Sequence, residues 1–66
     1  MADDLERRIR AAEFGRRIPN ERVLADEYSV SAGTVRRAVR ELRERGVVET
    51  LPAKGSFVAD PLPPGK

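Results

Sequence analysis

The chain has 66 residues, 36% of them charged, with a formal net charge of +2 and neither cysteine nor histidine. This length predicts one small domain without room for a catalytic cleft. The composition excludes disulfides, thiolate or histidine catalysis and the common zinc sites, so we expect no enzyme, metal or cofactor. No apolar run is long enough to cross a membrane or serve as a signal peptide, which favours a cytoplasmic protein.

Arginine supplies eleven of the thirteen basic residues. Arginine makes bidentate contacts to guanine edges and phosphates better than lysine does, so this bias favours a nucleic-acid partner. Genomic base composition would produce the same bias, and composition alone does not separate the two explanations.

The first predicted helix spans residues 3–14, where Asp3 or Asp4 can cap its start. Phe14 falls off the apolar stripe and is expected at or past the helix end, folded back into the core. The stripe itself consists of Leu5, Ile9 and Ala12. The arginines expected to be solvated are Arg7, Arg8 and Arg10.

A loop follows, in which Gly15 is expected to adopt a positive φ. Arg16 and Arg17 have two interpretations of equal standing, as phosphate contacts or as solvated loop residues. Ile18 precedes the next helix and is expected to pack onto it as a hydrophobic staple.

Two further helices are predicted over residues 20–28 and 32–45, joined by a tight turn. Asn20 and Ser31 are good N-caps for them, and Gly46 is expected to end the last helix. The apolar positions of the first of these two helices are Val23, Leu24 and Tyr28. Those of the second are Val35, Ala38, Val39 and Leu42, at the spacing of a buried face.

The opposite face of the helix at 32–45 is cationic and sterically open. At 100° per residue this face carries Gly33, Arg36, Arg37 and Arg40. A helix of this kind beside a short turn suits the DNA major groove. The alternative is a solvated surface helix with i, i+4 pairs such as Arg37–Glu41 and Arg40–Glu44. The small residues at the helix start favour close approach to a ligand; they are Ala32, Gly33 and Thr34.

The period then changes from 3.6 to 2, which predicts strands at 47–51 and 56–59 around a turn at 52–55. This hairpin would carry Lys54 and Gly55 at its tip. The packing residues are expected to be Phe57 and one of Val47 and Val48. The predicted fold class is α+β, mainly α: a three-helix winged helix-turn-helix with a C-terminal two-stranded hairpin as its wing.

The domain is expected to span residues 1–59. Residues 60–66 are proline-rich and are interpreted as a disordered tail or the start of a linker.

The motifs Ile18-Pro-Asn-Glu-Arg22, Leu24-Ala25, Val30-Ser31, Thr34-Val35-Arg36-Arg37-Ala38, Gly46-Val47-Val48 and Lys54-Gly55-Ser56-Phe57-Val58 occur in order across the chain. With this spacing the sequence resembles the winged helix-turn-helix domain of GntR-family bacterial transcription regulators. The likeness runs from the first helix to Ala59. It fits a HutC-like member or a stand-alone small regulator.

The resemblance implies DNA contacts at positions that match the family's motifs. Arg22 matches a helix-two contact, and Lys54 with Gly55 matches a wing tip that enters the minor groove. The matching recognition-helix contacts to phosphates and bases are Ser31, Thr34 and Arg36. We count the neighbouring Ala32, Gly33, Arg37 and Arg40 in the same interface.

The sequence departs from the family pattern at three alanines. Ala32 stands where arginine is common, so one base contact would be missing, while Ala12 and Ala53 stand where glycine is usual. GntR-family regulators usually carry a further, effector-binding domain, so the 66 residues are interpreted either as the DNA-binding part of a longer regulator or as a stand-alone small regulator.

The predicted function is sequence-specific binding of double-stranded DNA by a bacterial transcription regulator, most simply a repressor. The expected partner is a palindromic operator in the bacterial nucleoid, on which two copies pair weakly, and no membrane partner is expected. The alternative is a winged-helix protein-interaction or assembly module. Ala32 and Ala53 favour that alternative, whereas arginine at 22, 36, 37 and 40 argues against it, because protein interfaces centre on apolar anchors.

Overall fold

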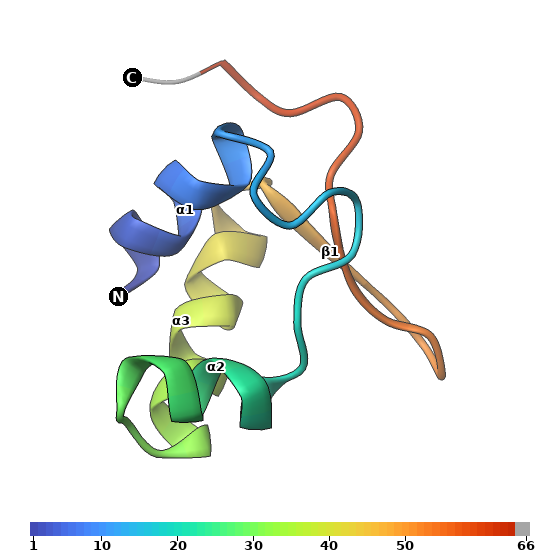
Figure 1. Ribbon diagram of the computed structural model, residues 1–66. Coiled ribbons are helices and arrows are strands. Elements are labelled where there is room, and N and C mark those ends of the chain that lie inside the picture. The colour runs from blue at the N-terminus through green and yellow to red at the C-terminus, as the bar shows by residue number, and fades with distance from the viewer. Residues whose placement is uncertain (65–66) are drawn as a thin grey trace.

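The computed structural model describes residues 1–64 (Figure 1). Three helices precede a two-stranded antiparallel sheet, and the order of elements is α1 (Ala2–Arg10), α2 (Glu21–Tyr28), α3 (Ala32–Glu44), β1 (Val48–Leu51) and β2 (Gly55–Val58). Figure 1 shows α1 beside the upper part of α3 and α2 across its lower part, with the hairpin projecting away from the helices. This arrangement confirms the predicted fold class.

Helix α1 is shorter than the predicted range 3–14. It begins after Met1, which caps it without a side-chain hydrogen bond, so neither Asp3 nor Asp4 is the cap. It ends at Arg10, because Ala12 takes a left-handed conformation with φ +60°. Ala12 therefore leaves the core stripe and is exposed, contrary to the prediction.

The predicted caps of α2 and α3 are confirmed. The Oδ1 of Asn20 accepts a hydrogen bond from the backbone N–H of Val23 at 3.0 Å, and the Oγ of Ser31 accepts one from Thr34 at 3.2 Å. These local contacts fix the start of each helix, and hence the direction in which each helix leaves the turn. Helix α3 ends one residue before its predicted limit, and Gly46 follows with φ +80°.

The core forms where the three helices meet the base of the hairpin. Its largest fully buried side chains are Leu5, Leu24, Val35, Leu42 and Val47. Ile18 is also buried, as the staple predicts. Of the apolar residues of α2, Leu24 and Ala25 are buried in the core, whereas Val23 is 51% exposed.

The hairpin packs through a different face from the one predicted. Its register pairs Val48 with Val58 and Glu49 with Phe57. Directly paired residues share one face of an antiparallel sheet, so the two valines point into the core while Phe57 shares the outer face with the exposed Glu49. Val48 and Val58 are therefore buried, and Phe57 is only half-buried. Val47, just before β1, is also buried.

The loop before α2 anchors the hairpin to the helices. The N–H of Ile18 donates to the carbonyl of Ser56 at 3.0 Å, and the N–H of Val58 donates to the carbonyl of Arg16 at 2.6 Å. Arg17 forms a bridge with Phe57, and its guanidinium lies 6.0 Å from the ring centroid. Because these contacts run along β2, the wing has a fixed base.

The proline-rich segment follows the wing. Asp60 pairs with Arg16 at 3.2 Å, Leu62 packs against the core, and a ring carbon of Pro63 approaches Gly46. Residues 65–66 lie outside the described part of the chain. The domain limit at residue 59 remains a prediction.

Candidate nucleic-acid interface

The outer face of α3 is open and basic. Its predicted members are all exposed, namely Gly33, Arg36, Arg37 and Arg40. The predicted pairs Arg37–Glu41 and Arg40–Glu44 do not form; Glu41 pairs with Arg45 instead. Neither Arg37 nor Arg40 has an ion-pair partner within residues 1–64. The two i, i+4 pairs that would neutralise this face in a merely solvated helix are therefore not seen, and the i, i+4 pair that does form, Glu41–Arg45, leaves Arg37 and Arg40 unpaired within residues 1–64.

Small side chains lie at the start of this helix, which Ser31 caps. Ser31 and Thr34 are exposed and Ala32 is half-buried. The hydroxyls of Ser31 and Thr34 lie 3.1 Å apart, close to the backbone N–H groups of the first turn of α3. Helix N-termini favour anions, so hydroxyls in this position suit a phosphate oxygen.

Arg36 is held by a residue from another helix. Its Nε lies 3.0 Å from Oε2 of Glu21, and its Nη2 lies 3.3 Å from Oε1. The hydrogen bonds from Arg36 hold the pKa of Glu21 below its usual range, and the same carboxylate raises the pKa of Arg36. Sequence patterns do not predict this pair, because its members are 15 residues apart and lie in different helices.

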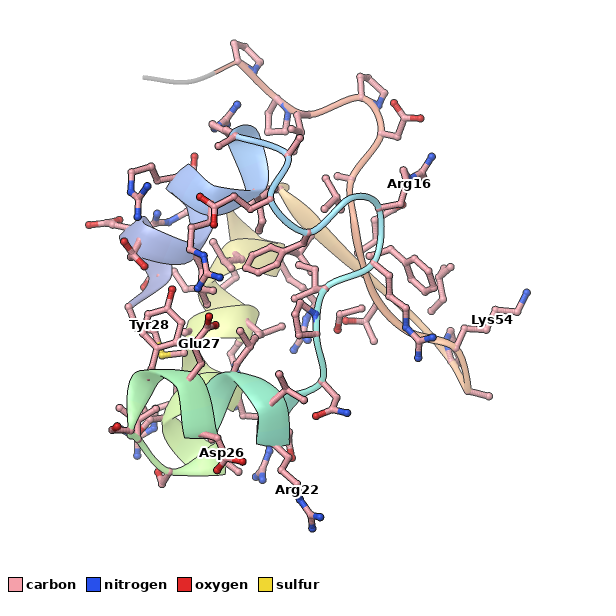
Figure 2. All side chains as sticks on the ribbon, viewed as in Figure 1. Arg16, Arg22, Asp26, Glu27, Tyr28 and Lys54 are labelled. Carbon is pink, nitrogen blue, oxygen red and sulfur yellow. The ribbon has the colours of Figure 1, made fainter. Side chains whose placement is uncertain are left out.

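Arg22 and Lys54 extend away from the body of the protein. Figure 2 shows Arg22 directed outward from the first turn of α2 and Lys54 directed outward from the end of the hairpin. Lys54 lies in the turn between the strands, whereas Gly55 is the first residue of β2 rather than part of the turn.

Arg17 lies beside the wing. A Cβ added at Gly55 would sit 3.6 Å from its Nη2, so the guanidinium runs alongside the strand. From the sequence alone, Arg17 could contact phosphate or be solvated. Arg17 lies beside the hairpin because the loop before α2 pairs with β2, a long-range contact that the sequence does not indicate.

A groove of roughly 580 Å³ lies between the wing, α2 and α3. Arg17, Gly55 and Ser56 line one side, and Val39 with Arg43 of α3 contributes another. The start of α2 completes it with Glu21 and the exposed Val23. The recognition-helix candidate and the wing thus border one continuous depression.

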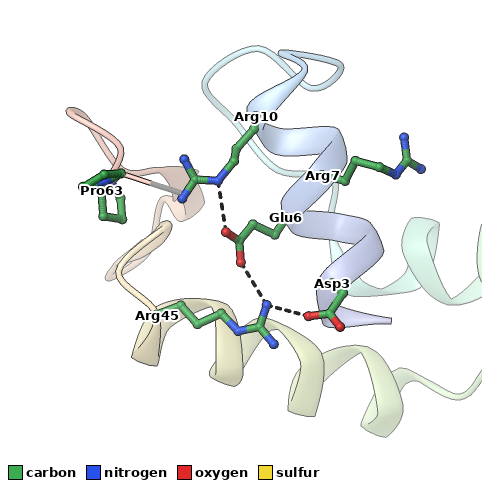
Figure 3. A pocket seen from close by; sticks show the side chains of 7 residues that line it. Asp3, Glu6, Arg7, Arg10, Arg45 and Pro63 are labelled. Atoms are coloured by element: carbon green, nitrogen blue, oxygen red, sulfur yellow. Dashed lines mark hydrogen bonds and ion pairs between the residues drawn. The ribbon is translucent and has the colours of Figure 1, made fainter. Parts of the chain in front are cut away.

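The far side of the molecule has a different electrostatic character. In Figure 3, Arg45 at the end of α3 contacts Asp3 at 2.8 Å and Glu6 at 2.9 Å, and Glu6 also binds Arg10 at 3.0 Å. Arg45 and then Arg10 lower the pKa of Glu6. These charges neutralise one another and join α1 to α3.

Arg8 departs from the prediction that the arginines of α1 are solvated. Its side chain is only 16% exposed and contacts Glu27 at 3.0 Å. Its guanidinium lies 4.6 Å from the ring centroid of Phe14 and 5.6 Å from that of Tyr28. Glu27 and Tyr28 point from α2 toward α1 in Figure 2, so Arg8 ties these helices together.

Tyr28 completes this contact between α1 and α2. Its hydroxyl donates to Asp4, and this hydrogen bond is the main reason that the pKa of Asp4 is lowered. Burial, followed by the bond to Asp4, raises the pKa of Tyr28. The partially buried polar groups of Arg8 and Tyr28 are hydrogen-bonded within the protein, so they have a structural role.

Within residues 1–64 no acidic group has the arrangement of a metal site, and no helix has the length and apolar character needed to cross a membrane.

Residues 1–58 match the family model described as bacterial regulatory proteins, gntR family. The chain belongs to this family. The match confirms the family predicted from the sequence, and with it the winged helix-turn-helix fold. The members are described as regulatory proteins, which agrees with the predicted class of function.

Several gntR-type relatives are similar in sequence. The mannosyl-D-glycerate transport/metabolism system repressor MngR of Escherichia coli is 34% identical over 91% of the chain and 26% of its own length. The histidine utilization repressor of Klebsiella aerogenes is 42% identical over 68% of the chain and 19% of its own length.

An HTH-type transcriptional regulator of Mycobacterium tuberculosis is 44% identical over 68% of the chain and 37% of its own length. The chain thus spans well under half the length of these relatives. Their names describe transcription regulators or repressors and give no support to a protein-interaction module.

Proposed function

We propose that this gntR-family domain binds double-stranded DNA sequence-specifically, as part of a transcription regulator that acts most simply as a repressor. The observation that carries the proposal is the outer face of α3, where Arg36, Arg37 and Arg40 are exposed and no large apolar side chain lies between them. A protein-binding surface would be expected to centre on apolar anchors.

Helix α3 enters the major groove in this proposal, and the wing reaches the adjacent minor groove. Arg36 reads a guanine edge, because the arginine fork matches the O6 and N7 acceptors. Arg37 and Arg40 extend the contact along α3, and Gly33 with Ala32 permits close approach of the helix start to DNA.

Phosphate contacts would fix the orientation of the domain on the duplex. Ser31 and Thr34 suit this role at the N-terminus of α3, Arg22 at the start of α2, and Lys54 with Gly55 on the wing. The groove between the wing and α3 would receive the sugar-phosphate strand that separates the two DNA grooves. Arg17 lines that groove and joins the proposed phosphate contacts.

The proposed target is a palindrome of G-T and A-C half-sites, bound by two copies of the chain in the bacterial cytoplasm and nucleoid. Two-fold related domains need half-sites separated by roughly one helical turn of DNA. We place the limit of the binding domain at residue 59, so that residues 60–66 would serve as a linker.

The test is fluorescence anisotropy of the chain with a palindromic G-T/A-C duplex and with a scrambled duplex of equal length, across a salt series. We expect tighter binding to the palindrome and a linear fall of log affinity with log salt concentration, whose slope reports the phosphate contacts. Absence of binding even at low salt would overturn the proposal and favour the protein-interaction alternative.

A further inference from the structure

Glu21 and Arg36 meet across two helices on the surface that the proposed function assigns to DNA. Glu21 is in the first turn of α2, and Arg36 is in the second turn of α3. The carboxylate engages the Nε and Nη2 atoms of the guanidinium at 3.0 and 3.3 Å. This is a side-on, bidentate contact, which fixes the plane of the guanidinium as well as its position.

The contact leaves the outer edge of Arg36 available. A guanidinium has five N–H groups, and Glu21 accepts one from Nε and one from Nη2. Both N–H groups of Nη1 and the second N–H of Nη2 remain. Those two nitrogens form the end-on fork that binds O6 and N7 of guanine. Glu21 and a guanine can therefore bind Arg36 together, on different edges.

Stability does not account for the pair. The Arg36 side chain is 67% exposed and that of Glu21 is 45% exposed. Ion pairs with this exposure contribute little to folding, because water and salt screen them and two long side chains lose rotamer freedom. An unconstrained arginine would have to lose the same freedom when it binds DNA.

We infer that Glu21 is a positioning residue that holds Arg36 in the orientation needed to read a guanine in the major groove. The inference rests on the proposed function. Glu21 sets the guanidinium plane before DNA arrives, so part of the ordering cost is met in the free protein.

A positioning role for Glu21 and simple charge repulsion predict opposite changes in affinity for the specific duplex when Glu21 is neutralised. A carboxylate beside the DNA phosphates repels them, so its neutralisation alone should tighten binding to every duplex. If Glu21 orients Arg36, its neutralisation should weaken binding to the specific duplex and leave non-specific binding equal or tighter. The ratio of the two affinities separates the mechanisms.

The experiment compares the parent chain with Glu21→Gln by anisotropy titration against the palindromic G-T/A-C duplex and the scrambled duplex. We expect the preference for the palindrome to fall roughly tenfold, a fraction of the discrimination that one bidentate arginine–guanine contact provides. The affinity for the scrambled duplex should stay equal or rise. Circular dichroism melting checks that the variant is folded.

Asp26→Asn is the matched control. It removes one negative charge from the same helix at an exposed residue that has no ion pair within residues 1–64. We expect it to change the affinity for both duplexes by the same factor, so that the preference ratio stays at the parent value.

A double-mutant cycle with Arg36→Ala completes the test. If Glu21 acts through Arg36, adding Glu21→Gln to Arg36→Ala should not lower the preference further. If the parent prefers the palindrome and Glu21→Gln shows the same preference ratio, this inference alone is overturned. It is also overturned if Glu21→Gln lowers the preference ratio as much in the Arg36→Ala background as in the parent. Equal binding of both duplexes by the parent would overturn the inference together with the proposed specificity.

Discussion

Arginines on the two sides of the molecule have different surroundings. Around α1, where it contacts α2 and the end of α3, Arg7, Arg8, Arg10 and Arg45 all pair with carboxylates. On α2 and on the outer face of α3, Arg22, Arg37 and Arg40 have no ion pair within residues 1–64. Arg36 pairs there with Glu21.

This contrast explains how a chain with a net charge of only +2 can present a basic surface. Six carboxylates pair with the arginines around α1 and cancel their charge, namely Asp3, Asp4, Glu6, Glu13, Glu27 and Glu41. The opposite side keeps its positive charge, which is the distribution that favours a polyanionic partner. The net charge of the chain is therefore a poor measure of the positive charge on the surface proposed to bind DNA.

The largest expected effect comes from removing charge on the basic side. We expect Arg36→Ala to weaken binding to the palindromic duplex roughly 10- to 100-fold and to relax preference at one base pair, because the bidentate contact to guanine is lost. Arg10→Ala, on the neutralised side, should leave the affinity for both duplexes unchanged. Equal effects of the two variants in anisotropy titrations would abolish the distinction between the sides.

The ion pairs between α1 and the end of α3 should instead make the stability of the fold depend on pH. Arg45 lowers the pKa of Glu6 below its usual value of 4.5, so this pairing stabilises the fold above pH 4.5 and the contribution is lost as pH falls through the lowered pKa. We expect Arg45→Gln to melt below the parent at pH 7, with the difference shrinking below about pH 4.5. Thermal melts between pH 3 and pH 7 provide the measurement.

Arg43→Gln is the control for that titration, since Arg43 donates to the hydroxyl of Thr50 at 3.1 Å and has no carboxylate partner within residues 1–64. Its melting difference from the parent should not depend on pH in this range. A pH-independent difference for Arg45→Gln as well would show that its ion pairs do not stabilise the fold.

Features that depend on local sequence could be predicted. The caps at Asn20 and Ser31 each bind a backbone N–H three residues on, and the two faces of α3 follow from helical periodicity. Features that depend on residues distant in the sequence could not be predicted. The environment of Arg8 is set by Glu27, 19 residues away, and the choice of Val58 over Phe57 for the core is set by hairpin register.

The interface residues divide in the same way. Periodicity placed Arg36, Arg37 and Arg40 on one exposed face, whereas the orientation of Arg36 depends on Glu21 in another helix. Arg17 could not be assigned from sequence because its place beside the wing depends on pairing between the loop and β2.

A smaller effect is expected at the wing. Lys54→Ala should weaken binding to the palindromic and scrambled duplexes by the same factor and reduce the salt slope by roughly one unit, because a single phosphate contact is lost. The measurement is the anisotropy salt series. A loss confined to the palindrome would show that the wing reads bases rather than phosphates.

The smallest effects are expected at two alanines, one on each side of the molecule. Ala12 and Ala53 both adopt a left-handed backbone conformation, with φ angles of +60° and +63°. A left-handed conformation strains alanine but not glycine, while glycine loses more entropy on folding. We expect a net gain of about 0.5–1 kcal/mol for Ala12→Gly and for Ala53→Gly, or a rise in melting temperature of roughly 3–6 °C.

DNA binding should then distinguish the two alanines. Ala53 lies in the turn of the wing next to Lys54, so loss of its methyl group allows closer approach to the minor groove, and affinity for both duplexes should rise about twofold. Ala12 lies at the end of α1, where the same substitution should leave affinity unchanged. If both variants gained stability and neither changed affinity, the turn of the wing would lie outside the DNA contact, and the basic surface would end at α3.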